Sequence, residues 1–148
     1  MQAEKSLCNE GEIHRLIDDW ANTLRAKDLD TLMSYYAPDV VFFDGIPPLQ
    51  YTGTETYRKN WADYFTWFPG PFNFETRDLK IKAADDTAFA HCLVHMTGTN
   101  AEGKEDGAWL RMTVCYEKID GKWLVTHEHW SLPMDMESGK ALTNLQPE

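Results

Sequence analysis

The stretch Arg111-Met-Thr-Val-Cys-Tyr-Glu-Lys-Ile-Asp-Gly-Lys-Trp-Leu-Val-Thr-His-Glu-His-Trp-Ser131 decides the fold of this chain. Two β-rich runs, 110–118 and 123–132, flank Asp120-Gly121, a dipeptide that supplies the positive φ angles of a two-residue type I′ turn. The pattern predicts a long β-hairpin.

The register of this hairpin determines which side chains share a face of the sheet. We expect Ile119 and Lys122 to close the turn, and directly paired residues then lie on the same face. The predicted ladder pairs Cys115 with Thr126, Thr113 with Glu128, and Arg111 with Trp130. The opposite face would carry Met112, Val114, Tyr116, Trp123, Val125, His127 and His129. A slip of one residue in one strand would break this pairing.

Length and composition favour a single globular domain. The chain has 148 residues, of which 43% are hydrophobic and 13% aromatic, with six Trp. This is enough for one domain with its own core. Fourteen basic against 24 acidic side chains give a formal net charge of −10, without a Lys/Arg cluster. Nucleic acid and anionic membranes need local positive charge, so neither is an expected partner.

Cysteine usage and the N-terminus indicate the cellular compartment. Cys8, Cys92 and Cys115 lack metal-type spacing, which indicates reduced thiols. Residues 1–6 lack the basic start and apolar core of a signal peptide, and no apolar run approaches membrane-spanning length. We therefore expect a cytoplasmic protein.

Helical periodicity is confined to the first half of the chain. Apolar residues recur at helical spacing from 13 to 24, which predicts a helix over about 10–26 with Asn9 as N-cap and Glu12 as its partner. Asp28 is placed to cap a short second helix that reaches Tyr36 and that Pro38 stops. A third helix follows Gly53 and carries an aromatic face, Tyr57, Trp61, Tyr64, Phe65 and Phe68.

The remainder of the chain reads as strands. A short strand over 40–44 ends in Asp44, beside the loop 45–48, where functional groups often collect. From residue 72 onward we expect the strands 72–83 and 87–99, followed by the hairpin. Helices followed by long antiparallel strands make an α+β domain with the helices on one face of a curved sheet.

This order of elements resembles the nuclear transport factor 2-like cone fold. That superfamily includes SnoaL-like polyketide cyclases, ketosteroid isomerase and the association domain of calcium/calmodulin-dependent protein kinase II. The most specific motif, Arg111-x-Thr113 followed by Gly121-Lys-Trp123-x-Val125-x-His127-x-His129-x-Ser131, is similar to the signature of SnoaL-like proteins of the ketosteroid isomerase-like group. Because the superfamily holds enzymes, binding proteins and assembly modules, the motif marks the fold more than the reaction.

The resemblance implies a division of the chain and a shape for its domain. We expect an N-terminal extension over 1–9, a SnoaL-like domain over 10–133 and a C-terminal tail over 134–148. The domain would be a cone-shaped α+β fold, with three N-terminal helices packed on a curved, mostly antiparallel sheet.

The resemblance also implies site residues. Tyr36-Ala-Pro-Asp39 and Val41-Phe-Phe-Asp44 resemble the segment of ketosteroid isomerase that ends in its general-base aspartate, which places Asp44 at the base position. The two oxyanion donors of that family fall on Trp20 and near Thr113, and neither replacement reproduces the original pair. The same comparison turns two sets of residues toward the cavity: Phe89, His91, Leu93 and His95 on one strand, and Thr126, Glu128 and Trp130 on another.

The residues expected in this cavity suit acid–base chemistry. Apolar walls raise the pKa of a carboxylate and lower that of a histidine, which brings both nearer neutral pH. We predict Asp44 as the base, His91 or His95 as the proton relay, and Arg111 as the group that holds a substrate oxygen. The predicted substrate-binding residues are Trp20, Tyr57, Trp61, Phe65, Arg111, Thr113, Glu128 and Trp130. No metal and no other cofactor is expected.

Each of these residues has a structural alternative. Asp44 would serve equally well as a cap for the loop at Gly45. Arg111 and Glu128 would form a buried structural ion pair, and His91 and His95 would be satisfied core or rim histidines. His127 and His129 have a metal-ligand spacing, but the register places them outside the cavity and the spacing implies no third ligand.

The expected outer face of the hairpin indicates a partner. Met112, Val114, Tyr116, Trp123 and Val125 would form a face too apolar for solvent, which predicts a homodimer packed sheet to sheet, as is common in the superfamily. The sequence thus predicts a SnoaL-like small-molecule enzyme of the isomerase, cyclase or hydratase type. The alternative is a non-catalytic small-molecule-binding or dimeric assembly module of the same fold.

Overall fold

The computed structural model describes residues 2–148, which form three helices and six strands. The helices are α1 (Gln2–Arg25), α2 (Leu29–Met33) and α3 (Thr54–Trp67). The strands are β1 (Tyr36–Phe43), β2 (Tyr51–Thr52), β3 (Phe72–Ala83), β4 (Thr87–Thr99), β5 (Glu105–Ile119) and β6 (Lys122–Ser131). The expected α+β class is confirmed, and the short strand β2 is an addition to the predicted order.

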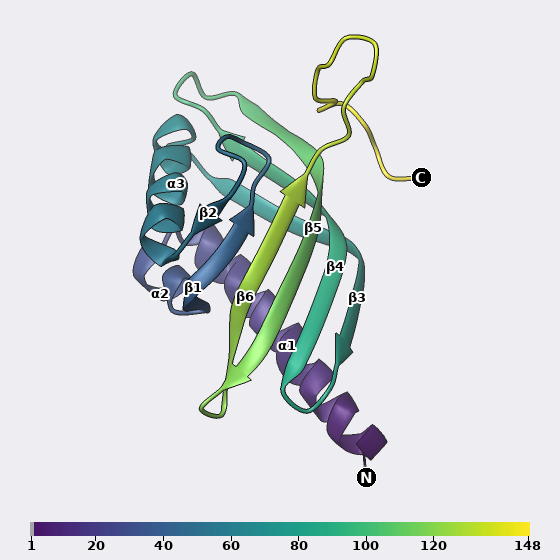
Figure 1. Cartoon of the computed structure of the whole chain (residues 1–148). Helices are drawn as coiled ribbons and strands as arrows, with labels where there is room; N and C mark the ends of the chain where they lie inside the picture. The colour runs from purple at the N-terminus through teal and green to yellow at the C-terminus, as the bar shows by residue number, and fades with distance from the viewer. Residues whose placement is uncertain (1) are drawn as a thin grey trace.

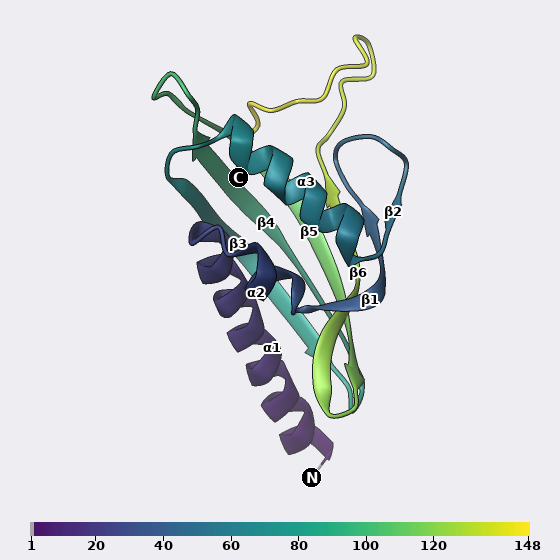
Figure 2. The same ribbon diagram turned by 90° about the vertical axis from the view of Figure 1, so that its left-hand side faces the viewer.

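All six strands belong to one sheet in the order β2-β1-β6-β5-β4-β3. Neighbouring strands are antiparallel, except that β1 and β6 run parallel. Figures 1 and 2 show α1 running along one face of the sheet, with α2 and α3 on the same side. The opposite face of the long strands carries no helix, and we call it the outer face. No helix within residues 2–148 has the length and apolarity that a membrane crossing requires.

Helix α1 begins at Gln2, eight positions before the predicted start at residue 10. Asn9 is therefore not an N-cap: it is buried inside the helix, and its Nδ2 donates to the carbonyl of Ala84 at 2.9 Å. Ser6 donates to the carbonyl of Ala83 at 2.8 Å. The early turns were missed because polar contacts with the β3–β4 turn hold them, and these contacts leave no apolar periodicity in the sequence.

Helix α2 starts as predicted but ends sooner. Asp28 caps it by accepting the backbone N–H of Thr31 at 3.2 Å. Tyr36, expected in this helix, instead opens β1, and Pro38 lies inside that strand. The pairing of β1 with β6 is interrupted between Tyr36 and Val41. A proline has no N–H to give to a ladder, so it is tolerated in this interruption.

The hairpin contains a β-bulge that the sequence reading did not anticipate. Asp120 and Gly121 have φ angles of 52° and 79°, and Ile119 pairs with Lys122, so the turn is confirmed. The ladder then shifts by one residue at Thr126, because Tyr116 pairs with Val125 and Cys115 pairs with His127. A bulge of this kind places two residues of one strand opposite one of its partner.

The bulge corrects the predicted faces of the hairpin. The expected pairs of Cys115 with Thr126, Thr113 with Glu128 and Arg111 with Trp130 are wrong. The residues expected to form an apolar outer surface are instead buried on the helix side: Met112, Val114, Tyr116, Trp123 and Val125. Glu128 and Trp130 lie on that same side, whereas Arg111, Thr113 and His129 are exposed on the outer face.

The core forms where α1 lies along the sheet. Ile13, Ile17 and Leu24 of this helix are buried within the same cluster as Val114 and Val125. Full burial of a side chain of this size contributes about 1.5–3 kcal/mol. At its edge, Trp123 Nε1 donates to the carboxylate of Glu12 at 2.8 Å, which ties β6 to α1. The core therefore fixes both the helix and the half of β6 that precedes the bulge.

Candidate functional site

A cavity of about 300 Å³ lies between α3 and the sheet. Its walls are mostly apolar and include five aromatic side chains: Tyr57, Trp61 and Tyr64 of α3, Phe68 directly after that helix, and Trp130 of β6. A volume of this size falls at the lower end of the range for small-molecule pockets. The cavity is therefore suited to a compact ligand with an apolar body.

The aromatic wall follows from the helical spacing of α3 and from close packing beneath it. Tyr57 stacks on Phe42 of β1 with ring centroids 3.6 Å apart and an interplanar angle of 15°. At the other end of the helix, the Phe68 ring lies so close to Gly98 of β4 that a Cβ there would approach it to 2.7 Å. The glycine thus lets the helix end settle directly on the strand.

Polar groups stand at a few points of this apolar wall. They are Asp44 at the end of β1, Asn60 on α3, Asp106 on β5 and Thr143 in the C-terminal tail. Among the described lining residues, none is Lys, Arg or His. The cavity therefore presents two carboxylates and no compensating positive charge.

Asp44 combines the two roles that the sequence left open. Its carboxylate accepts the backbone N–H of Gly45 at 2.7 Å, as a loop cap does, and it also lines the cavity. Burial raises the pKa of Asp44 above its usual value, while the Gly45 N–H and the nearby side chain of Asn60 oppose the rise. A carboxylate shifted in this direction holds a proton more readily than an exposed one.

Directly behind the cavity wall lies a buried carboxylate, Glu128, which is 2% exposed. It accepts hydrogen bonds from the Tyr36 hydroxyl at 2.9 Å, from Trp130 Nε1 at 2.8 Å and from the Tyr57 hydroxyl. Burial raises the pKa of Glu128 to about 6, although these three donors act in the opposite direction. A buried charge persists only where such donors surround it.

Tyr57 connects this buried carboxylate to the cavity. Its ring lines the cavity, and its hydroxyl donates to Glu128. Burial raises the pKa of Tyr57 well above its usual value, and the negative charges of Glu128 and Asp44 add to the rise. The hydroxyl therefore stays protonated at neutral pH.

The structure brings four of the predicted site residues together at the cavity: Asp44, Tyr57, Trp61 and Trp130. Three others lie nearby without lining it: Trp20 and Glu128 are buried, and Phe65 is partly buried. Trp20 Nε1 donates to the Tyr36 hydroxyl at 2.8 Å, Glu128 lies behind Tyr57, and Phe65 packs against Phe72.

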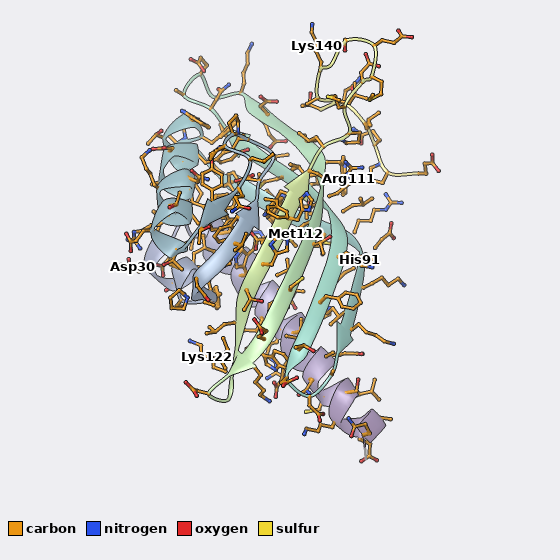
Figure 3. All side chains as sticks on the ribbon, in the orientation of Figure 1. Asp30, His91, Arg111, Met112, Lys122 and Lys140 are labelled. Atoms are coloured by element: carbon orange, nitrogen blue, oxygen red, sulfur yellow. The ribbon has the colours of Figure 1, made fainter. Side chains whose placement is uncertain are left out.

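The remaining four predicted residues are on the outer face, so their expected orientation is wrong. His91 is exposed opposite Thr113, and the His95 ring stacks on Trp109 with centroids 4.8 Å apart. Arg111 Nε donates to Ser131 Oγ at 3.0 Å, so it forms no ion pair with Glu128. Figure 3 marks His91 and Arg111 among the side chains of the sheet.

The strand β4 explains why the histidines were misplaced. Its inward side chains are Ala90, Cys92, Val94 and Met96, and these are buried against the helices. Large residues alternate with them on the exposed side, including Phe89 at 47% exposure. The apolar residues at every second position from Ala90 to Met96, with no charged or polar side chain among them, were the signal for the inner face.

His127 and His129 lie on the outer face, where the sequence placed them. His127 Nδ1 is 2.8 Å from the carbonyl oxygen of Val41, and both imidazole rings pack against Phe43. Within residues 2–148, no group of three or more His, Cys, Asp or Glu side chains is arranged to hold a metal ion. The two imidazole rings therefore serve the packing of the outer face.

Sequence reasoning missed several residues of the site. Tyr64 and Phe68 were visible on the aromatic face of the third helix but were not singled out. Asn60, Asp106 and Thr143 carried no pattern. Thr143 belongs to the tail, which turns back between Asp135 and Lys140 and brings its far part to the cavity. Only the folded chain reveals these contributions.

Known proteins share both the sequence pattern and the fold of this chain. The family profile of the SnoaL-like domain matches residues 13–135. A nuclear transport factor 2-like protein of unknown function from Pseudomonas putida KT2440 is 39% identical, with a TM-score of 0.87, and the match covers 96% of this chain and 99% of that one. No curated protein matches the chain at a significant level.

Two more distant solved structures share the fold. A candidate scytalone dehydratase from Novosphingobium aromaticivorans is 16% identical, with a TM-score of 0.79 and 89% of each chain covered. A candidate calcium/calmodulin-dependent protein kinase II association domain from Xanthomonas campestris is 24% identical, with a TM-score of 0.74, over 90% of this chain and 88% of that one. At these identities the likeness concerns the fold alone.

Proposed function

Because the chain belongs to the SnoaL-like domain family, we propose that it is a small-molecule enzyme of the isomerase, cyclase or hydratase type that uses general acid–base chemistry. We take the cavity beside Asp44 to be the conical pocket expected of this fold. One observation carries the proposal: Asp44, a carboxylate with a raised pKa, lines the same cavity as Tyr57, whose hydroxyl stays protonated.

In this proposal Asp44 is the base. It takes a proton from a carbon next to a carbonyl group. The electron pair of the C–H bond becomes the C=C bond of an enolate, and the π pair of the carbonyl moves to the oxygen. The proton on Asp44 exchanges with solvent before Asp44 protonates the carbon again. A base is most effective when its pKa lies near the working pH, and burial moves Asp44 in that direction. Apolar walls also exclude the water that would otherwise solvate the carboxylate.

Tyr57 takes over the role that the sequence gave to a histidine, because His91 and His95 lie on the outer face. Its side chain lines the cavity that Asp44 also lines, and its hydroxyl is held by Glu128. Glu128 does not line the cavity, so we assign it as a positioning residue that fixes Tyr57 and Trp130. The candidate scytalone dehydratase with this fold is compatible with such chemistry, but a shared fold does not carry a substrate.

Proton exchange provides a direct test of the reaction type. The purified protein is incubated in D₂O with a panel of small cyclic ketones, and deuterium incorporation next to the carbonyl is followed by NMR. We expect incorporation above the buffer rate for at least one ketone, since removal of that proton is the proposed first step. Incorporation at the buffer rate across the panel would contradict the enzymatic proposal.

A non-catalytic assembly module is the second candidate, and the outer face favours it. This face carries Phe43 and Phe89, which are 37% and 47% exposed, beside the partly buried Leu93 and His127. Exposed aromatic groups on an uncovered sheet are typical of an interface. We propose that two copies pack through these residues rather than through the buried set expected from the sequence.

The mass in solution tests this dimer. Phe89→Glu places a charge in the proposed interface and should convert a dimer into a monomer in light scattering after size exclusion. Leu49→Glu is the matched control, because Leu49 is 96% exposed in the loop between β1 and β2 and should leave the mass unchanged. A monomeric wild type, or a dimer that persists in Phe89→Glu, would refute the interface.

A further inference from the structure

We propose that Asn60 and Trp61, consecutive residues of α3, donate the two hydrogen bonds that hold the ligand's oxygen atom, and that the ligand is a neutral ring compound with a carbonyl-type acceptor. This inference rests on the proposed function for the location of the site, and it goes beyond it by naming the oxygen-binding groups and the class of ligand.

The first step of the argument is that two buried donors have no partner. Within residues 2–148, Asn60 Nδ2 and Trp61 Nε1 are the two buried side-chain nitrogen or oxygen atoms that make no hydrogen bond. Buried polar groups in folded proteins are nearly always paired, since an unpaired one loses its bonds to water without replacement. Both residues line the cavity, and Trp61 is only 6% exposed.

The two donors lie next to the groups assigned to the chemistry. The Asn60 side chain lies near enough to Asp44 to lower the pKa of that carboxyl group as a hydrogen-bond donor would, and Trp61 does the same for the Tyr57 hydroxyl. Neither contact reaches hydrogen-bond geometry, so both N–H groups are left for a ligand. The base, the hydroxyl and the two unpaired N–H groups therefore meet in one part of the cavity. An oxygen atom bound there would have its neighbouring carbon beside Asp44.

Charge determines which kind of oxygen fits. Amide and indole N–H groups are donors, so they require an acceptor on the ligand. A carboxylate or phosphate would supply acceptors, but Asp44 and Asp106 both line the cavity and would repel it. Arg111, the residue expected to hold an anionic oxygen, is on the other side of the sheet. A neutral carbonyl oxygen satisfies both conditions.

The walls determine the body of the ligand. Five aromatic rings surround a volume of about 300 Å³. Aromatic walls favour flat, apolar groups that stack or meet them edge to face. One ring or two fused rings match this space, with the carbonyl directed toward Asn60 and Trp61.

The same donors would assist the reaction. When Asp44 removes the proton beside the carbonyl, negative charge develops on the oxygen, and fixed N–H donors in a cavity shielded from water stabilise that charge. Asn60 and Trp61 would thus supply the function that the sequence had assigned to Arg111. They would also replace the oxyanion donors that Trp20 and Thr113 do not provide.

Binding of two matched probes tests the inference without turnover. 1-Tetralone and tetralin have the same fused rings and differ in one carbonyl oxygen, and their dissociation constants are measured by ligand-observed NMR titration. We expect the wild type to bind the ketone about tenfold more tightly, the change for two hydrogen bonds that each contribute modestly. Asn60→Leu should lower this preference to about threefold, and Asn60→Leu with Trp61→Phe should remove it.

Controls separate this result from loss of folding and from failure of the proposed reaction. Trp67→Phe, on the exposed side of the same helix, should keep the full preference. The preference is a ratio within one variant, so a general weakening of both probes does not imitate its loss. A third probe, 1,2,3,4-tetrahydro-1-naphthoate, should bind at least tenfold more weakly than the ketone because of its negative charge.

The outcomes distinguish the two proposals. Three results would overturn the oxygen-binding assignment. The first is a wild type that binds the two neutral probes equally or binds neither. The others are a preference that survives in the double variant and tighter binding of the carboxylate. Asp44→Asn should keep the ketone preference while losing deuterium exchange. If the wild type and all variants lack deuterium exchange but the ketone preference is present, the oxygen-binding assignment is supported and the enzymatic proposal is contradicted. If exchange occurs without a ketone preference, the enzymatic proposal is supported and the oxygen-binding assignment is contradicted.

Discussion

Replacement of Asp44 by Asn should reduce the rate of deuterium incorporation into a ketone substrate by about 100- to 10,000-fold, the usual contribution of a positioned general base. Asparagine has nearly the same shape and can still contact the loop at Gly45, so the melting temperature should change little. The measurement is the exchange rate by NMR for both proteins at equal concentration. An Asp44→Asn protein that retains the wild-type rate would remove Asp44 from the mechanism.

Asp106 provides a matched control for this substitution, because it is the other carboxylate in the cavity. Asp106 is exposed and accepts the N–H of Gly107 at 2.9 Å. We expect Asp106→Asn to retain most of the activity. A larger loss in Asp106→Asn than in Asp44→Asn would transfer the role of base from one carboxylate to the other.

The pH profile should identify the same group. A base works only in its ionised form, so the exchange rate should rise with pH through the pKa of Asp44 and then level off. Because burial raises that pKa, the rise should occur at a higher pH than for an exposed aspartate. A rate that falls as the pH increases through this region would indicate a catalytic acid in its place.

Replacement of Glu128 by Ala should lower the free energy of unfolding by about 3–5 kcal/mol, which is large for a single substitution. The change leaves three buried donors, Tyr36, Tyr57 and Trp130, without their common acceptor. Urea denaturation followed by fluorescence measures the loss. Glu128→Gln keeps one acceptor oxygen and should cost less, while Glu117→Ala on the exposed side of β5 should be nearly neutral.

The charge of Glu128 also makes stability depend on pH. Its pKa in the folded protein is about 6, above the usual 4.5, so the folded state binds the proton more tightly than the unfolded state. The stabilisation is complete below pH 4.5 and is lost as the pH rises through 6, a change of roughly 2 kcal/mol. Glu128→Gln should lack this decline, and an identical decline in both proteins would assign it to other groups.

Most elements of the fold were accessible from the sequence because their signals are local. The Asp120-Gly121 turn and the strands 72–83 and 87–99 agree with the structure residue by residue. The sequence did not predict which side chains of β6 face the helices. Trp123 and Val125 place the odd-numbered residues of β6 on the buried face, whereas Trp130 places the even-numbered ones there. His127 and His129 lie between them and suit either face. The sequence therefore did not show where the register changes.

The site was predictable only where its residues belong to a local pattern. Asp44 stood out at the end of a strand, and Tyr57 and Trp61 stood out on an aromatic helix face. Asn60 and Asp106 are ordinary surface residues in sequence, and they acquire meaning only when α3 meets β5. Arg111 and His91 appeared functional because of their type, and a face set by long-range packing turned them away.

The bulge at Thr126 also limits the insertions and deletions that β6 can tolerate during evolution. Without that one residue, the end of the strand would turn over, Glu128 and Trp130 would lie outside, and His127 and His129 would enter the core. Residues 100–104, in contrast, form a surface turn that can gain or lose a position with little consequence. In this strand the number of residues is therefore under stricter constraint than their identity.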